Sequence, residues 1–254
     1  MRKIFKEQKI INKICNFLKK EFKERKKKNA IVGISGGLDS GLVAYLCKKA
    51  NLNLYAVILP YKNRGLKEAK KVVEFLKLPE KQIFILDITS LIDKQVNTIS
   101  KIINLDKVNQ GNVIARQRMI VLYALAKSLN GLVVGTSNLS EYLLGYFTLH
   151  GDGAADIFPM GSLFKTQIYQ LAKYLKFPAW LVEKTPSADL WEGQTDEGEF
   201  GFSYKEADLI LSLFLKGLNE KQIADRIKNK KLTEKVLKRV ENTNFKRQGR
   251  VLPK

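Results

Sequence analysis

The sequence of 254 residues predicts an α/β fold, with a doubly wound and mostly parallel sheet of five strands and helices on both faces. Two observations favour this fold. Short apolar runs rich in β-branched residues alternate three times with segments of helical periodicity. The first of these runs, residues 30–34, passes directly into a glycine turn and then a helix, as expected for a buried parallel strand.

The individual elements are expected where the apolar period changes and where Pro or Gly interrupts it. Strands are expected at residues 30–34, 54–59, 82–87 and 132–134. Helices are expected at residues 3–28, from Asp39 onward, and at residues 67–76, 91–103, 111–129, 167–175, 204–215, 220–227 and 233–240. Residues 135–157 and 185–203 show no clear period and are expected to be loops. Because no linker or repeat is visible, residues 1–254 are expected to form a single domain.

The composition limits location and partners. No apolar run is long enough to span a membrane, and the charged N-terminus lacks a signal-peptide stretch, so a cytoplasmic protein without a membrane partner is expected. The net charge of +20 favours a lysine-rich solvated surface or the steering of a small polyanion, and nucleic acid is the least favoured partner. Cys15 and Cys47 fall at apolar positions of expected helices and are interpreted as buried.

The stretch Ser-Gly-Gly-Leu-Asp-Ser at residues 35–40 is the strongest local signal for chemistry. Gly36 and Gly37 allow a tight turn and a close approach of the backbone to a ligand. The helix that follows presents backbone N–H groups and the positive end of its dipole, which favours an anion. Asp39 adds a carboxylate suited to a metal ion. No lysine follows the glycines, so this is not a Walker loop, and the cation for the phosphates must come from elsewhere in the chain.

This loop resembles the pyrophosphate loop of the ATP pyrophosphatase superfamily, whose members cleave ATP between the α and β phosphates and adenylate a substrate. The resemblance implies a Rossmann-like sheet of the ATP pyrophosphatase type. It also implies that ATP is bound by Gly33, Ile34, Ser35, Gly36, Gly37, Leu38, Asp39 and Ser40.

Five further segments resemble one family of that superfamily, the ammonia-dependent NAD synthetases, in the same order. They are residues 111–119, 135–141, 145–156, 159–165 and 184–197. Several motifs in register are far less expected by chance than one. The resemblance implies a ligase that amidates deamido-NAD to NAD with ammonia through an adenylated carboxylate, releasing AMP and pyrophosphate in the last step of NAD biosynthesis. It also implies a homodimer, with the first helix and the helix at residues 111–129 at the interface.

The residues themselves suit adenylation chemistry. Forming an amide from a carboxylate requires a leaving group, which ATP supplies, and the developing charge lies on phosphate oxygens, so catalysis should rest on positioning and electrostatics. Asp39 and Glu141 are carboxylates on separate loops and are expected to hold Mg²⁺ at the phosphates. Glu141 follows the carboxyl end of a strand, where open sheets bind ligands. Lys165 is expected to supply the positive charge that the glycine loop lacks.

The family resemblance implies the remaining contacts. ATP is expected to contact Thr136, Lys165 and Ser187. Deamido-NAD is expected to contact Arg116, Asp156, His150, Phe245 and Lys246. Arg116 has a second interpretation, as a structural ion-pair partner. Leu149 and Phe245 stand where many family members have lysine and histidine, so the substrate contact is either remodelled there or compensated by His150 or Lys246.

The sequence favours ammonia as the nitrogen donor and leaves two alternative functions. Glutamine hydrolysis needs a further domain with a nucleophilic cysteine, and neither Cys15 nor Cys47 has a suitable neighbourhood, so no glutaminase domain and free or donated ammonia are expected. A tRNA-modifying ATP pyrophosphatase is favoured by the charge, but no catalytic cysteines or RNA-binding domain are visible. A nucleotide-binding module without turnover is disfavoured by the three expected catalytic residues. Residues 185–203 are hypothesised to form a lid.

Overall fold

A computed structural model describes residues 6–191 and 193–249. Its strands form one parallel sheet in the order β3-β2-β1-β4. The strands are β1 (Asn29–Gly33), β2 (Asn53–Ile58), β3 (Ile83–Ile85) and β4 (Gly131–Val133). In register, Ile31 of β1 pairs with Tyr55 of β2 and with Val133 of β4.

The expectation of five strands is wrong, because the described chain has four. At the position of a fifth strand only a single parallel bridge forms, between Val134 and Ile157. The neighbouring sequence explains this: Gly151 and Gly153 belong to a tight turn before the bridge, and Pro159 follows it without an N–H group. Pairing therefore cannot extend in either direction.

Helices cover both faces of the sheet, as the sequence predicted. On one face lie α1 (Lys6–Glu24), α2 (Leu38–Lys49), α3 (Leu66–Phe75), α7 (Lys165–Tyr174) and α8 (Ala179–Val182). The other face is covered by α4 (Thr89–Ser100) and α5 (Lys107–Ser128). Because successive strand residues point to opposite faces, Ala30 and Val32 of β1 enter the first core and Ile31 enters the second.

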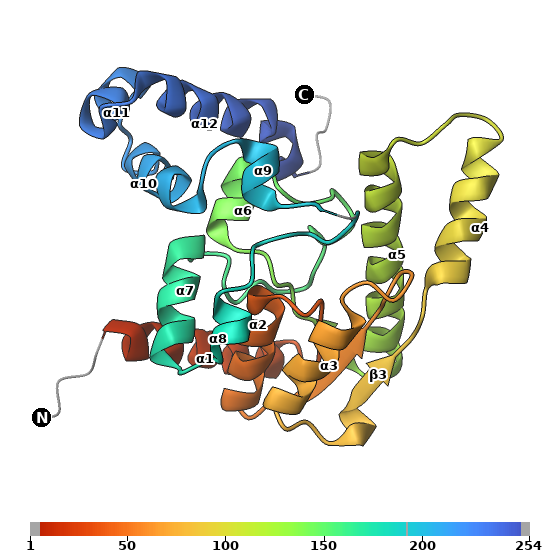
Figure 1. Cartoon of the computed structure of the whole chain (residues 1–254). Coiled ribbons are helices and arrows are strands. Elements are labelled where there is room, and N and C mark those ends of the chain that lie inside the picture. The colour runs from red at the N-terminus through yellow and green to blue at the C-terminus, as the bar shows by residue number, and fades with distance from the viewer. Residues whose placement is uncertain (1–5, 192, 250–254) are drawn as a thin grey trace, which may run out of the picture.

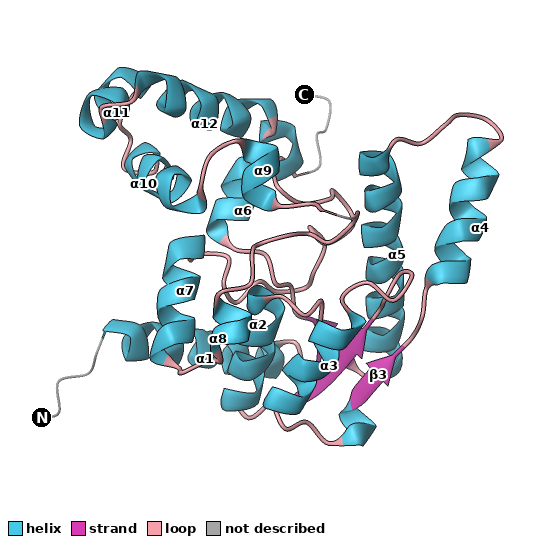
Figure 2. Cartoon of the chain, in the orientation of Figure 1, coloured by secondary structure: helices cyan, strands magenta, loops and turns pink. Residues whose placement is uncertain are grey.

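A third apolar cluster lies among the C-terminal helices, at the upper left of Figure 1. It joins α6 (Leu139–Leu144), the end of α9 (Asp196–Phe200), α10 (Tyr204–Phe214), α11 (Glu220–Ile227) and α12 (Lys230–Asn242). Two short 3₁₀ turns, η1 (Glu80–Gln82) and η2 (Asn244–Arg247), complete the elements. Figure 2 shows the long loops that run between these helices and the sheet.

Two segments expected to be loops contain short helices. Within residues 135–157, α6 begins at the capping residue Asn138, whose side chain accepts from the backbone N–H of Glu141. It ends at Gly145, which has a φ of +63° and no space for a side chain, because a Cβ there would lie 2.3 Å from Thr243. Within residues 185–203, α9 begins at the cap Thr195. Neither helix is long enough to show a clear 3.6-residue period.

The remaining expected elements are present, with described ends within a few residues of those expected, and residues 3–5 of the first expected helix lie outside the described residues. The amphipathic α1 packs its apolar stripe against α2 and α7, and Ile11 and Leu18 are fully buried. Among the described residues, no helix is both long and apolar enough to cross a membrane.

Candidate active site

A pocket of about 420 Å³ opens at the carboxyl end of the sheet. Its walls come from the loop after β1, the end of β2, the segment after β4, the side of α5 and residues 184–191. The strand order reverses between β1 and β4, since the chain runs from β1 outward to β3 and then returns to the other side of β1. Open α/β sheets bind ligands at such a switch point.

The glycine loop after β1 is braced by its own hydroxyl groups. The Oγ atoms of Ser35 and Ser40 lie 3.2 Å apart, and Ser40 Oγ donates to the carbonyl of Gly37 at 3.0 Å. Gly36 has a φ of +80°, and a Cβ there would lie 2.6 Å from Glu68 at the start of α3. Of the residues expected to bind ATP in this loop, all except Gly36 line the pocket, because Gly36 packs against α3 instead.

Lys165 joins the two expected metal-binding carboxylates. Its Nζ lies 2.8 Å from Asp39 Oδ2 and 3.4 Å from Glu141 Oε1. The Lys165 side chain is only 7% exposed, and the two carboxylates are 13% and 15% exposed. The structure therefore brings together all three residues expected to be catalytic, in a largely water-excluded position at the pocket wall.

Asn138, which was not predicted as a site residue, organises this cluster. Asn138 is fully buried, and its Nδ2 donates to Asp39 Oδ2 at 2.8 Å. Its Oδ1 accepts from the backbone N–H of Glu141 at 3.0 Å, and its own backbone N–H donates to Glu141 Oε2 at 3.2 Å, so this one residue contacts both carboxylates. Nearby, the backbone N–H of Lys165 donates to Ser140 Oγ at 2.8 Å, and this hydroxyl donates to Asp208. Its sequence position could have indicated this role, because Asn138 lies in segment 135–141, which resembles the family.

Burial and charge act in opposite directions within the cluster. Burial raises the pKa of Glu141, which the ammonium of Lys165 opposes and the carboxylate of Asp39 reinforces. Burial by itself would lower the pKa of Lys165, but Asp39 and Glu141 more than offset it, so this pKa is raised overall. Lys165 thus keeps its charge in the pocket.

The carboxylates fit a hard cation. Asp39 Oδ1 is buried and has no hydrogen-bond partner, while Asp39 Oδ2 already accepts from Lys165 and Asn138. An unpartnered buried carboxylate oxygen is costly, and a cation such as Mg²⁺ would satisfy it. Across the parts of the chain that the structure describes, no three His, Cys, Asp or Glu side chains converge to hold a metal ion.

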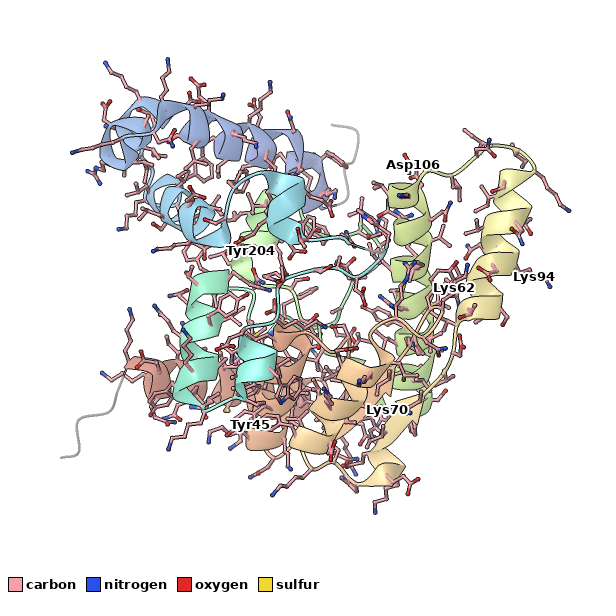
Figure 3. All side chains as sticks on the ribbon, viewed as in Figure 1. Tyr45, Lys62, Lys70, Lys94, Asp106 and Tyr204 are labelled. Carbon is pink, nitrogen blue, oxygen red and sulfur yellow. The ribbon has the colours of Figure 1, made fainter. Side chains whose placement is uncertain are left out.

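A third buried carboxylate, Asp196, was also missed. It is 4% exposed, and its Oδ2 accepts from the hydroxyl of Tyr204 at 2.9 Å, while its Oδ1 is buried without a partner. Burial raises the pKa of Asp196, and Lys165 opposes this shift. Tyr204 lies at the start of α10, toward the middle of the molecule (Figure 3), and its ring centroid is 5.4 Å from Lys165 Nζ.

Thr136 and Ser187, the other residues expected to contact ATP, both line the pocket. Four further cationic residues line it without having been predicted as site residues, namely Arg239 and three others. Lys184 Nζ donates to the carbonyl of Gly36 at 3.1 Å, Arg64 Nη1 donates to the carbonyl of Leu190 at 2.6 Å, and Arg118 Nε donates to the carbonyl of Leu59 at 3.1 Å. The phosphate loop therefore has several positive neighbours besides Lys165.

Only one of the five residues expected to contact deamido-NAD lines the pocket. This is Lys246, whose Nζ donates to the carbonyls of Gly145 and Phe147, both at 2.8 Å. The other four are not among the pocket-lining residues. Arg116 is exposed and donates to the carbonyl of Leu149, Asp156 accepts from the backbone N–H of Val133, and His150 and Phe245 are exposed. Their substrate roles stay predictions.

Comparison with known proteins identifies the family. A family model described as NAD synthase matches residues 10–250. The chain belongs to the NAD synthase family.

Individual members of the NAD synthase family are similar over nearly their whole length. The NH(3)-dependent NAD(+) synthetase of Fusobacterium nucleatum is 41% identical over 252 residues, which are 96% of this chain and 95% of that protein. Among solved structures, the NH3-dependent NAD synthetase of Campylobacter jejuni has a TM-score of 0.82 at 33% identity, covering 98% of this chain and all of that one. The NMN synthetase of Francisella tularensis has a TM-score of 0.85 at 33% identity, covering 98% of this chain and 99% of that one.

Proposed function

We propose that this chain is an ammonia-dependent NAD synthetase. It adenylates the carboxylate of deamido-NAD with ATP, and ammonia then displaces AMP to give NAD. The observation that carries the proposal is the Asp39–Lys165–Glu141 cluster beside the glycine loop, at the switch point of a sheet whose sequence belongs to the NAD synthase family.

The glycine loop and its cations bind the triphosphate of ATP. The backbone N–H groups at the start of α2 receive the phosphates, with Thr136 and Ser187 on the other walls of the pocket. The ammonium of Lys165 stabilises the charge that develops on the phosphate oxygens as the α–β bond breaks. Because this ammonium is already held in place and desolvated, it needs little reorganisation during the reaction.

Asp39 and Glu141 hold Mg²⁺ together with the phosphates. The metal, when bound, neutralises phosphate charge and polarises the phosphate that is attacked. The orphaned Oδ1 of Asp39 supports its role as a ligand.

Ammonia is the nitrogen donor, and residues 1–254 act as one synthetase domain without a glutaminase domain. Support comes from the similar protein of Fusobacterium nucleatum, which is named an NH(3)-dependent NAD(+) synthetase. The match covers 95% of that protein. Neither a membrane nor a nucleic acid takes part in the proposed reaction, and the proposed location is the cytoplasm.

The proposed enzyme is a homodimer with α5 at its interface. Val108 and Ile120 of α5 are apolar and more than half exposed, and the proposed substrate residue Arg116 lies on the same helix. The predicted contribution of α1 is weaker, because its apolar stripe is buried inside the chain. Light scattering at working concentration is expected to give twice the chain mass of 28.9 kDa, and a monomeric mass would refute this proposal.

One assay tests the proposed reaction. Purified protein is incubated with ATP, Mg²⁺, ammonium and deamido-NAD, and NAD and AMP are followed. We expect equal amounts of both products, with glutamine unable to replace ammonium. AMP formed only when tRNA is added would instead favour an RNA-modifying enzyme, and equal turnover with glutamine would overturn the ammonia assignment.

Nicotinate mononucleotide is the second candidate substrate. The similarity to the NMN synthetase of Francisella tularensis supports this candidate. A second support is that four residues expected to contact deamido-NAD are not among those that line the pocket, namely Arg116, Asp156, His150 and Phe245. A mononucleotide lacks the adenylyl half of deamido-NAD and would need fewer contacts than the dinucleotide. The same assay with nicotinate mononucleotide decides between them: the substrate with the higher kcat/KM is the preferred one, and we expect this to be deamido-NAD.

A further inference from the structure

Arg239, in the last turn of α12, contacts two separate walls of the pocket. It is half-buried and lines the pocket, although it lies in none of the segments that resemble the family. One wall is α6, which carries Glu141. The other belongs to residues 185–191 and 193–203, the described part of the segment predicted to be a lid, which we call the covering segment.

The contact with α6 is made by the guanidinium edge. Arg239 Nε donates to the carbonyl of Leu144 at 3.1 Å. This carbonyl is one of those that the end of a helix leaves without an intrahelical partner. Arg247 donates to the neighbouring carbonyl of Leu143 at 2.8 Å, so cations from α12 and η2 cap the end of α6 opposite to Glu141.

The same guanidinium also contacts the covering segment. The central carbon of the Arg239 guanidinium lies 4.6 Å from the ring centroid of Phe200, the last residue of α9, and 5.7 Å from that of Tyr146. The two rings pack edge to face with centroids 4.6 Å apart. Phe200 is 3% exposed, so the aromatic side of this cation–π contact is shielded from water.

Hydrogen bonds continue from these rings into the covering segment as far as the proposed ATP contact. The Tyr146 hydroxyl donates to Glu199 Oε1 at 2.9 Å, and Gln194 Nε2 donates to the same oxygen at 2.7 Å. The carbonyl of Gln194 accepts from Ser187 Oγ at 2.6 Å. The place of Ser187 in the pocket therefore depends on α9 staying packed against Arg239.

We propose that Arg239 is a positioning residue that holds the covering segment closed over the ATP pocket, by clamping Phe200 of α9 onto the capped end of α6. The expected effect of Arg239 on ATP binding rests on the proposed function, whereas its expected effect on the closure of the covering segment does not. Arg239 suits this role because its planar group presents a hydrogen-bonding edge and a stacking face at once, which a lysine cannot do.

The test compares Arg239→Met with Lys235→Met in the full-length protein. Lys235 lies on the same helix and is exposed. It also contacts the covering segment, at the Phe202 ring and the carbonyl of Gly201, but in the described chain it contacts neither Phe200 nor α6, so it controls for the loss of a cationic contact as such. Limited digestion with a glutamate-specific protease is followed at Glu197 and Glu199. We expect Arg239→Met to raise the cleavage rate about tenfold and the KM for ATP by a similar factor, with a smaller change in kcat. Lys235→Met should change neither by more than about twofold.

A double-mutant cycle with Phe200→Leu keeps the inference falsifiable if Arg239→Met is poorly folded. Arg239→Lys serves as the milder replacement, because it keeps the charge and loses the planar group. Circular dichroism first confirms that each variant is folded.

If Arg239 acts through Phe200, the effects of the two substitutions on cleavage are strongly non-additive. Additive effects, unchanged cleavage, or equal opening in Lys235→Met would overturn the proposal. Because cleavage is measured without substrate, this result does not depend on the proposed reaction.

Discussion

Replacing Asp39 with asparagine is expected to lower kcat at least about 100-fold while leaving the fold intact. Asparagine keeps the shape of the side chain, and its carbonyl oxygen can still accept from Asn138 and Lys165, as Asp39 Oδ2 does. The substitution removes the negative charge and turns the unpartnered Oδ1 into an amide that cannot bind Mg²⁺. The loss should therefore appear in turnover and in the Mg²⁺ concentration needed for it.

Steady-state kinetics over a range of Mg²⁺ concentrations measures this prediction. Asp93→Asn is the matched control, because Asp93 is also an aspartate that accepts a hydrogen bond and lies near a lysine, but on an exposed surface away from the pocket. The control should stay within about twofold of the unaltered enzyme. A near-normal kcat for Asp39→Asn would remove Asp39 from the catalytic residues.

Replacing Lys165 with methionine is expected to abolish most activity and also to destabilise the fold by about 3–5 kcal/mol. Methionine fills a similar volume but leaves Asp39 and Glu141 largely buried without the cation that lies between them. Breaking a buried ion pair by removing one partner is costly, since the remaining charges have lost their solvent and gained nothing. The activity loss follows because no other ammonium is held between these two carboxylates in the described chain.

Urea unfolding and turnover separate the two effects. In the double variant Lys165→Met, Glu141→Gln, one of the uncompensated charges is gone, so part of the stability should return while the activity does not. Lys173→Met, on the exposed side of the same helix, should lie within about 0.5 kcal/mol of the unaltered protein. If Lys165→Met has the same free energy of unfolding as the unaltered protein, the ion pairs of Lys165 do not stabilise the fold.

The walls of the pocket differ in how they are held in place. Asp39, Asn138 and Lys165 begin or cap helices that pack into the main core or the C-terminal cluster, so their positions are fixed by folding. The covering segment contains only a five-residue helix and is held by side-chain contacts, among them Arg64 to Leu190 and Arg239 to Phe200. Segments of this kind are the ones that move during catalysis.

The sequence by itself determined the features that depend on local chemistry. The apolar run at residues 30–34 and the glycines after it specify a buried strand and a ligand-binding turn, because few other residue types permit that backbone path. The alternation of strands and helices specified a doubly wound sheet. Six motifs in order specified the NAD synthase family. Asp39, Glu141 and Lys165 were each predicted from residue type and motif, before any contact between them was known.

The tertiary structure alone decided how distant residues meet. Lys165 is 126 positions from Asp39, and only the packing of α7 beside α2 and α6 places its ammonium between the two carboxylates. Arg116 and Arg118 lie on nearly opposite sides of α5, and which of them lines the pocket depends on the helix face that the sheet covers. The contacts of Arg239, which join α12 to α6 and α9, are a further case. In each, the energy comes from long-range packing, which leaves no periodic mark on the local sequence.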